Sequence, residues 1–164
     1  MVLFVVCIVF GFRYRTVHVK GRSMSPTYED GDWTVIEKPS SLGKNWKPER
    51  LDVVLASDQG ELICKRVIGL EGDSIEIKNG NIYLNEKKFN DPFGQGKIVS
   101  DLVDENDDRL RFISGPKKGQ YATIEINEHK VTVPKGYVWV VGDNRRNSWY
   151  GILSIKNIKG LLII

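Results

Sequence analysis

Apolar and polar residues alternate in short runs along most of the chain, and Gly, Asn and Asp gather between the runs. Alternation with a period of two is typical of β-strands with one buried face. We therefore expect strands at Val17–Gly21, Trp33–Glu37, Leu51–Ala56, Glu61–Ile68, Ser74–Lys78, Asn81–Asn85, Tyr121–Ile126, His129–Val133, Tyr137–Val141 and Ile158–Ile164. Helix signals are scarce, and only a single turn is expected at Ser154–Asn157.

The segments between the runs predict how the strands connect. Ser57–Gly60 and Asn79–Gly80 each separate two neighbouring runs, and Asn-Gly is the strongest short hairpin signal. Many short strands joined by such turns indicate an all-β, mainly antiparallel barrel or sandwich. Two polar segments interrupt the rhythm, Pro39–Arg50 and Asp91–Gly119, and the second carries the acidic run Asp104–Asp108. We expect both to be solvated loops.

The N-terminal segment Met1–Phe12 is an unbroken apolar run without a charge. A membrane span needs about 20 apolar residues, so this run is too short to cross a membrane alone. The alternative is a buried first strand. Arg13, Arg15 and Lys20 follow it, and by the positive-inside rule they favour a cytoplasmic position for what comes next. We expect an anchor over residues 1–14 and one β domain over residues 15–164, with an inserted β and loop subregion around residues 86–130.

Composition narrows the function classes. The net charge of +3 comes from 24 basic and 21 acidic residues mixed along the chain, which gives no concentrated basic face for nucleic acid. Two cysteines, Cys7 and Cys64, cannot form a disulfide framework, and no paired Cys/His spacing suggests a metal site. We expect no metal site and no nucleic-acid partner.

Two segments carry candidate chemistry. Ser23 lies in the Gly- and Pro-bounded segment GRSMSPT, where a serine is ordinarily only a turn residue. Lys65 lies inside an apolar run, on the strand face that it shares with Ile63 and Val67. Burial there would lower the lysine pKa from about 10.4 to roughly 7–8, where the amine can accept a serine proton. The alternative is an edge-strand lysine that extends its amine into solvent.

A third segment, Gly142–Ser148 (GDNRRNS), follows the buried run Tyr137–Val141. The three boxes in this order resemble the type I signal peptidase family, a group of membrane-anchored serine proteases. Further matches are Gly31-Asp32, Arg50–Val54 and Val133–Tyr137, so that the resemblance runs from about Met1 to Gly160 and leaves largely Asp91–Gly119 uncovered.

The resemblance implies a role for each matching residue. Ser23 matches the nucleophile, Lys65 the general base, and Ser148 a serine whose hydroxyl orients the lysine amine. The Ser23 N–H would supply part of the oxyanion hole, and Gly21 stands where some relatives add a serine hydroxyl. Family members bind the substrate as an added β-strand, here between Val17–Arg22 and Glu61–Lys65. The implied substrate-binding residues are Val19, Gly21, Arg22, Met24, Leu62, Ile63 and Cys64, and the implied structural supports are Arg66, Asp143 and Asn144.

The chain departs from the family pattern after Ser148. Many members continue with Ser-x-Asp-Ser-Arg, whereas this chain has Ser148-Trp149-Tyr150-Gly151. In relatives that aspartate pairs with the arginine that matches Arg66. Arg66 is therefore expected either to pair with Asp143 or to be exposed, because an unpaired buried charge is costly.

The implied function is removal of signal peptides from exported preproteins at a lipid membrane, and no metal or organic cofactor is implied. The family pattern also suggests that Met1–Phe12 is the end of a membrane span. The family places the catalytic domain outside the cytoplasmic membrane, and we follow the family against the basic flank of the anchor. Two alternatives remain. One is a LexA-like self-cleaving Ser/Lys protease, although the chain lacks the Ala-Gly and Cys-Gly dipeptides at which those proteins cut. The other is a non-catalytic, membrane-tethered β-domain, which only the altered turn after Ser148 supports.

Overall fold

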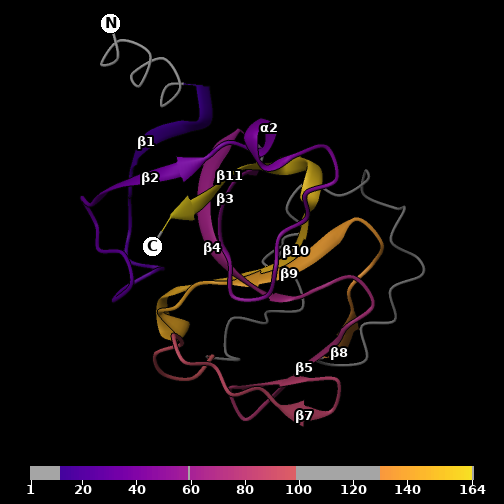
Figure 1. Cartoon of the computed structure of the whole chain (residues 1–164). Coiled ribbons are helices and arrows are strands. Elements are labelled where there is room, and N and C mark those ends of the chain that lie inside the picture. The colour runs from indigo at the N-terminus through magenta and orange to yellow at the C-terminus, as the bar shows by residue number, and fades with distance from the viewer. Residues whose placement is uncertain (1–11, 59, 99–129, 164) are drawn as a thin grey trace, which may run out of the picture.

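The computed structural model describes residues 12–58, 60–98 and 130–163 as a mostly antiparallel β structure (Figure 1). This confirms the all-β prediction. The strands are β1 (Tyr14–His18), β2 (Trp33–Glu37), β3 (Val53–Asp58), β4 (Glu61–Gly69), β5 (Ser74–Lys78), β6 (Asn81–Leu84), β7 (Lys87–Lys88), β8 (Lys130–Thr132), β9 (Tyr137–Val141), β10 (Tyr150–Ser154) and β11 (Ile158–Ile163). Three short helices accompany them in the described part: α2 (Pro39–Leu42), η2 (Arg145–Asn147) and η3 (Ile155–Asn157).

The larger sheet has seven strands in the order β1-β2-β11-β3-β4-β9-β10, and Figure 1 shows it curling strongly on itself. The register of β4 against β9 shifts between Val67 and Gly69, and that of β11 against β3 shifts between Ile158 and Gly160. Such irregularities bend a sheet and increase its twist. β4, which carries the candidate base Lys65, therefore lies inside a curved sheet, between β3 and β9.

The smaller sheet has the order β7-β6-β5-β8 and forms the lower part of the molecule in Figure 1. Asn79 and Gly80, with φ of 49° and 72°, make the expected hairpin between β5 and β6. Ile68 of β4 packs with Ile75, Ile77 and Trp139 in one buried cluster. The core is thus continuous between the two sheets.

Most strand boundaries agree with the sequence prediction, and one disagreement concerns the site. The expected strand Val17–Gly21 is instead Tyr14–His18, since Gly21 has φ of 84° and ends the extended run. The backbone of Val19 then pairs with the following turn, at Gly31 and Asp32. The predictions also missed β7, β10 and α2, whereas Tyr121–Ile126 lies outside the described residues.

The expected membrane anchor lies almost wholly outside the described residues. Of residues 1–14 only Phe12, Arg13 and Tyr14 are described: the side chain of Phe12 is 75% exposed, and Tyr14 already belongs to β1. Over residues 12–58, 60–98 and 130–163, no helix is long and apolar enough to cross a membrane.

Candidate active site

Ser23 lies in a tight loop that is anchored in the hydrophobic core by the residue that follows it. The next residue, Met24, is 1% exposed and packs with Tyr28, Ile36 and Val53 in a buried cluster. Met24 was expected to bind substrate, and it both anchors this loop and lines the pocket described below. The Ser23 side chain is therefore presented from a loop whose neighbour is fixed in the core.

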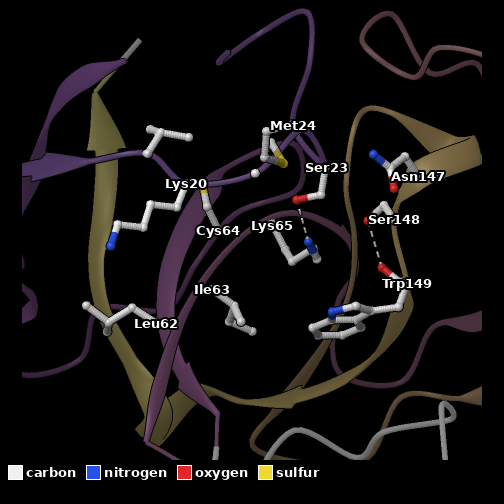
Figure 2. A pocket seen from close by; sticks show the side chains of 12 residues that line it. Lys20, Ser23, Met24, Leu62, Ile63, Cys64, Lys65, Asn147, Ser148 and Trp149 are labelled. Carbon is white, nitrogen blue, oxygen red and sulfur yellow. Dashed lines mark hydrogen bonds between the residues drawn. The ribbon is translucent and has the colours of Figure 1, made fainter. Parts of the chain in front are cut away.

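Lys65 points into the interior beside Ser23. Its side chain is only 3% exposed, which excludes the alternative in which the amine extends into solvent. Its Nζ donates a hydrogen bond of 2.8 Å to Ser23 Oγ, a contact across 42 residues of sequence (Figure 2). Burial lowers the pKa of Lys65 to about 8, against smaller opposing effects of Cys64 and Asp143. A substantial fraction of the amine is therefore neutral near physiological pH, and a neutral amine in this place can accept the Ser23 proton.

Arg66, the next residue on β4, points away from Lys65 and is completely buried. Its Nε and Nη2 donate to the two carboxylate oxygens of Asp143, at 2.7 and 2.6 Å, and both side chains are 0% exposed. Thr27, from the serine box, donates a 2.5 Å hydrogen bond to the same carboxylate. Asp143 is thus the partner of Arg66, and the alternative of an exposed Arg66 is wrong. This buried, bidentate pair joins all three boxes.

The GDN box also holds the Ser23 loop directly. The backbone N–H of Asn144 donates to the Ser23 carbonyl at 3.1 Å, and its side-chain amide donates to the Arg22 carbonyl at 3.2 Å. A Cβ on Gly142 would lie 2.1 Å from that Ser23 carbonyl oxygen. Only glycine therefore allows the two loops to approach this closely.

Ser148 differs from its expected contact. Its Oγ accepts a 2.8 Å hydrogen bond from the Gly142 N–H and donates a 2.9 Å bond to the Trp149 carbonyl. The Lys65 amine bonds to Ser23 instead, so the direct bond from Ser148 to that amine is not made in this structure. The physical reason is that the tight turn leaves the Gly142 N–H in need of an acceptor, and the Ser148 hydroxyl supplies it.

A pocket of about 200 Å³ opens beside the Ser23–Lys65 pair (Figure 2). Six of the seven expected substrate-binding residues line it: Val19, Gly21, Met24, Leu62, Ile63 and Cys64. Arg22 is the exception, because its side chain is exposed outside the pocket lining. Residues that were not expected also line the pocket, namely Lys20, Asn147 and Trp149. The arrangement is a serine and a buried amine at the edge of a small pocket that both apolar and polar residues line.

A model of the family described as signal peptidase, peptidase S26, matches residues 1–162. The chain belongs to this family. Signal peptidase I of Bacillus caldolyticus is 32% identical over 94% of this chain and 82% of its own length. Signal peptidase I of Streptococcus pneumoniae serotype 4 is 30% identical, over 91% of this chain and 80% of its own length. Among solved structures, a signal peptidase I of Enterococcus faecalis aligns with 72% of this chain and 98% of its own at 24% identity, with a TM-score of 0.45.

Membership of the signal peptidase family confirms the resemblance drawn from the three boxes and makes the chain a serine peptidase. Because the match extends over residues 1–162, it favours this family over the self-cleaving repressor-type proteases.

The sequence prediction missed one residue next to Lys65. The Nζ of Lys65 lies 5.0 Å from the centroid of the Trp149 ring. Trp149 is half-buried and packs against the cluster that contains Val54 and Leu153. No sequence signal pointed to it, because Trp149 stands at the variable position of the pattern Ser-x-Asp-Ser-Arg, and the first departure from that pattern is Tyr150.

The segment Asp91–Gly119 was expected to be a solvated loop, and the sequence did not predict that its beginning packs against the rest of the protein. Asp91 forms an ion pair with Arg145, whose side chain is 6% exposed. The ring of Phe93 lies 3.8 Å from the Arg66 guanidinium carbon. Gln95 donates its N–H to the Asp143 carbonyl at 2.7 Å and accepts from the Arg145 N–H at 3.0 Å. Residues 91–95, called the clamp segment below, are therefore packed against the GDN box, while residues 99–119 lie outside the described part of the chain.

Proposed function

We propose that this chain is a membrane-bound serine endopeptidase that removes N-terminal signal peptides from exported preproteins, with Ser23 as nucleophile and Lys65 as general base. The observation that carries the proposal is the 2.8 Å contact between Ser23 Oγ and the Nζ of a lysine that is 3% exposed. Two such groups within hydrogen-bond reach satisfy the geometric requirement for an activated nucleophile. The relatives named signal peptidase I supply the substrate class.

The reaction begins with the neutral Lys65 amine. It takes the proton from Ser23 Oγ as the oxygen attacks the scissile carbonyl, and the ammonium then gives that proton to the departing amine nitrogen. A water then attacks the acyl-enzyme carbonyl as Lys65 takes its proton, and the ammonium returns that proton to Ser23 Oγ as the bond between Oγ and the acyl carbon breaks. We assign part of the oxyanion hole to the Ser23 N–H, with no hydroxyl available from Gly21 two residues earlier.

The substrate would bind as an extended strand beside β4. Within the described sheet, β9 pairs with β4 only from Arg66 onward, whereas Glu61–Lys65 pairs with β3 alone. The other edge of Glu61–Lys65 is therefore available for an added strand. A pocket of about 200 Å³ favours small side chains next to the cut.

The membrane part of the proposal rests on the apolar run Met1–Phe12 and on the family resemblance. We place the anchor at residues 1–14, the catalytic domain at residues 15–164, and that domain on the extracytoplasmic side, where exported preproteins emerge. In this arrangement the anchor brings the pocket to membrane-bound substrates and takes no part in the chemistry.

The decisive experiment incubates the purified chain with a preprotein and sequences the products. We expect one cut at the end of the signal peptide, and we expect Ser23→Ala and Lys65→Ala each to abolish it. The double variant should be little worse than either single variant, because the two residues act as a unit. Ser25→Ala, two residues away in the same loop, is the matched control and should cleave normally. Intact preprotein with the wild-type chain would favour the non-catalytic β-domain, and cleavage of the chain itself would favour the self-cleaving type.

A further inference from the structure

Trp149 lies where the chain leaves the catalytic pocket and enters β10. Figure 2 shows its ring beneath the Lys65 side chain, with Ile63 across the pocket from it. The 5.0 Å from Nζ to the ring centroid is within the range of a cation–π contact. The ring is held there from both sides, because its backbone carbonyl accepts from Ser148 and its side chain packs against the core.

An indole in this place has two effects on the amine. Its bulk keeps water from Nζ, which favours the neutral amine. Its π face carries negative electrostatic potential, which attracts the ammonium and does so more strongly when water is excluded. The first effect lowers the pKa of Lys65 and the second raises it. Variants that remove one effect and keep the other can therefore separate the two contributions.

The other charged and titratable groups around Lys65 do not replace the indole. Asp143 is engaged by Arg66 in the buried pair. Burial raises the pKa of the Cys64 thiol to about 12, so that Cys64 carries no charge near neutral pH. Lys20, which also lines the pocket, is exposed and positive. The charge of Asp143 still favours the ammonium, and Trp149 is an uncharged side chain of the pocket that can do so as well, through its ring.

The proposed reaction requires both states of Lys65. The amine must be neutral when it meets Ser23, and it becomes a buried ammonium as the proton moves from Oγ to Nζ. An interaction that is stronger with the ammonium than with the amine stabilises the transition state more than the resting enzyme.

We propose that Trp149 takes part in the reaction by covering the Lys65 amine: its apolar bulk keeps the resting amine dry, and its π face stabilises the positive charge that Nζ acquires from Ser23. The part of this inference that concerns the reaction rests on the proposed function. The contact itself is a property of the folded chain and can be tested without a substrate.

The experiment compares Trp149→Leu, Trp149→Ala and Trp149→Phe in the full chain in detergent. The leucine keeps apolar cover and removes the π face, the alanine removes both, and the phenylalanine keeps a ring. The exposed Trp33, outside the pocket, provides the control Trp33→Leu. Two readouts are taken: the pH dependence of kcat with one signal-peptide substrate, and the NMR titration of the Lys65 side chain, assigned by its loss in Lys65→Met.

In the wild type, we expect kcat to rise with pH near pH 8 and the NMR signal of the Lys65 side chain to titrate at about the same pH. Trp149→Leu should lower the pKa of Lys65 and reduce kcat on the high-pH plateau by roughly tenfold, because the ammonium is less stabilised. Trp149→Ala should raise that pKa as water enters, so that its rate loss is largest near neutral pH. Trp149→Phe should restore most of the wild-type profile, and Trp33→Leu should match the wild type.

The result that would overturn the proposal is a rise in pKa in both Trp149→Leu and Trp149→Ala, which would make the ring a passive cover. An unchanged NMR titration in all three variants would equally overturn it. Because the titration needs no substrate, a chain that cleaves nothing but shows the opposite shifts would contradict the proposed function and still support the contact.

Discussion

At the scale of single residues, Lys65 shows how one position serves chemistry at the expense of stability. Its pKa falls from 10.5 to about 8 because the amine is buried. Below pH 8 the folded protein must therefore hold a buried ammonium, whereas the unfolded chain leaves it in water. The unfolded state binds more protons between pH 8 and 10.5, so Lys65 makes stability rise with pH in that window.

This titration predicts that Lys65→Met stabilises the fold at low pH. The difference between 10.5 and about 8 corresponds to roughly 3 kcal/mol, so we expect a gain of about 1–3 kcal/mol in the free energy of unfolding at pH 6. The gain should shrink between pH 8 and 10.5. Urea unfolding at several pH values measures it, with the exposed Lys87→Met as control. A gain that is independent of pH would mean that Lys65 is not a buried titrating amine.

Ser148 is the second residue for which the structure makes a specific prediction. Its hydroxyl satisfies the Gly142 N–H, next to the loop that presents Ser23. We propose that Ser148→Ala loosens this turn and lowers kcat by about ten- to a hundredfold, the equivalent of about 1–3 kcal/mol. KM should change little, and the rate should still rise with pH near 8, because Lys65 stays buried. The remote Ser41→Ala is the control. An unchanged kcat, or a rise only above about pH 10, would contradict this assignment.

At the scale of elements, the candidate site combines Lys65 on strand β4 with three segments outside the strands. The serine loop follows β1, the GDN box follows β9, and the clamp segment follows β7. The buried Arg66–Asp143 pair and the backbone bonds of Gln95 and Asn144 hold these pieces together. Precision in the site therefore comes from contacts between loops, with β4 as the rigid support for Lys65.

The clamp segment can be tested through Asp91. Asp91→Ala leaves Arg145 as an unpaired charge at 6% exposure, so we expect a loss of about 3–5 kcal/mol in the free energy of unfolding and a lower kcat. Asp91→Leu with Arg145→Met removes both charges and should recover most of the stability. The exposed Glu86–Lys130 pair gives the matched control, and Glu86→Ala should cost at most about 1 kcal/mol. Equal effects of Asp91→Ala and Glu86→Ala would show that the segment does not support the site.

At the scale of the whole molecule, the open edge of β4, the pocket and the serine loop are brought together by the curvature of the seven-stranded sheet. The described part of the chain begins at Phe12, followed by an ion pair of 2.7 Å between Arg13 and Glu37. The proposed anchor would therefore join the β domain at a point that is tied to β2, away from the residues of the pocket.

The membrane proposal predicts how the chain partitions. The full chain should enter detergent or lipid, and deletion of Met1–Phe12 should give a more soluble domain with similar turnover on a soluble peptide. Cleavage of a membrane-bound preprotein should fall, since the anchor serves only to meet that substrate. Flotation with liposomes measures the partition. A full chain that is monomeric and stays out of detergent and lipid would contradict the anchor.

Much of this architecture follows from the sequence by itself. The strands Trp33–Glu37, Ser74–Lys78 and Tyr137–Val141 have the predicted bounds, because their alternating or apolar runs and their turns are local signals. β10 was missed because pairing with β9, more than its own pattern, makes it a strand. Ser23 and Lys65 were found from the boxes that contain them and from their order.

The remaining features were decided by the tertiary structure. The burial of Lys65, the pairing of Arg66 with Asp143, the clamp of Asp91 on Arg145 and the ring of Trp149 over the amine all depend on folding. Arg66 and Asp143 are 77 residues apart and Asp91 and Arg145 are 54 apart. Local sequence patterns report on neighbours within a strand or turn, whereas burial and partner choice are set by which distant segments the sheet brings together. For that reason the sequence determined which residues are candidates for the chemistry, and the fold alone decided the environment in which they lie.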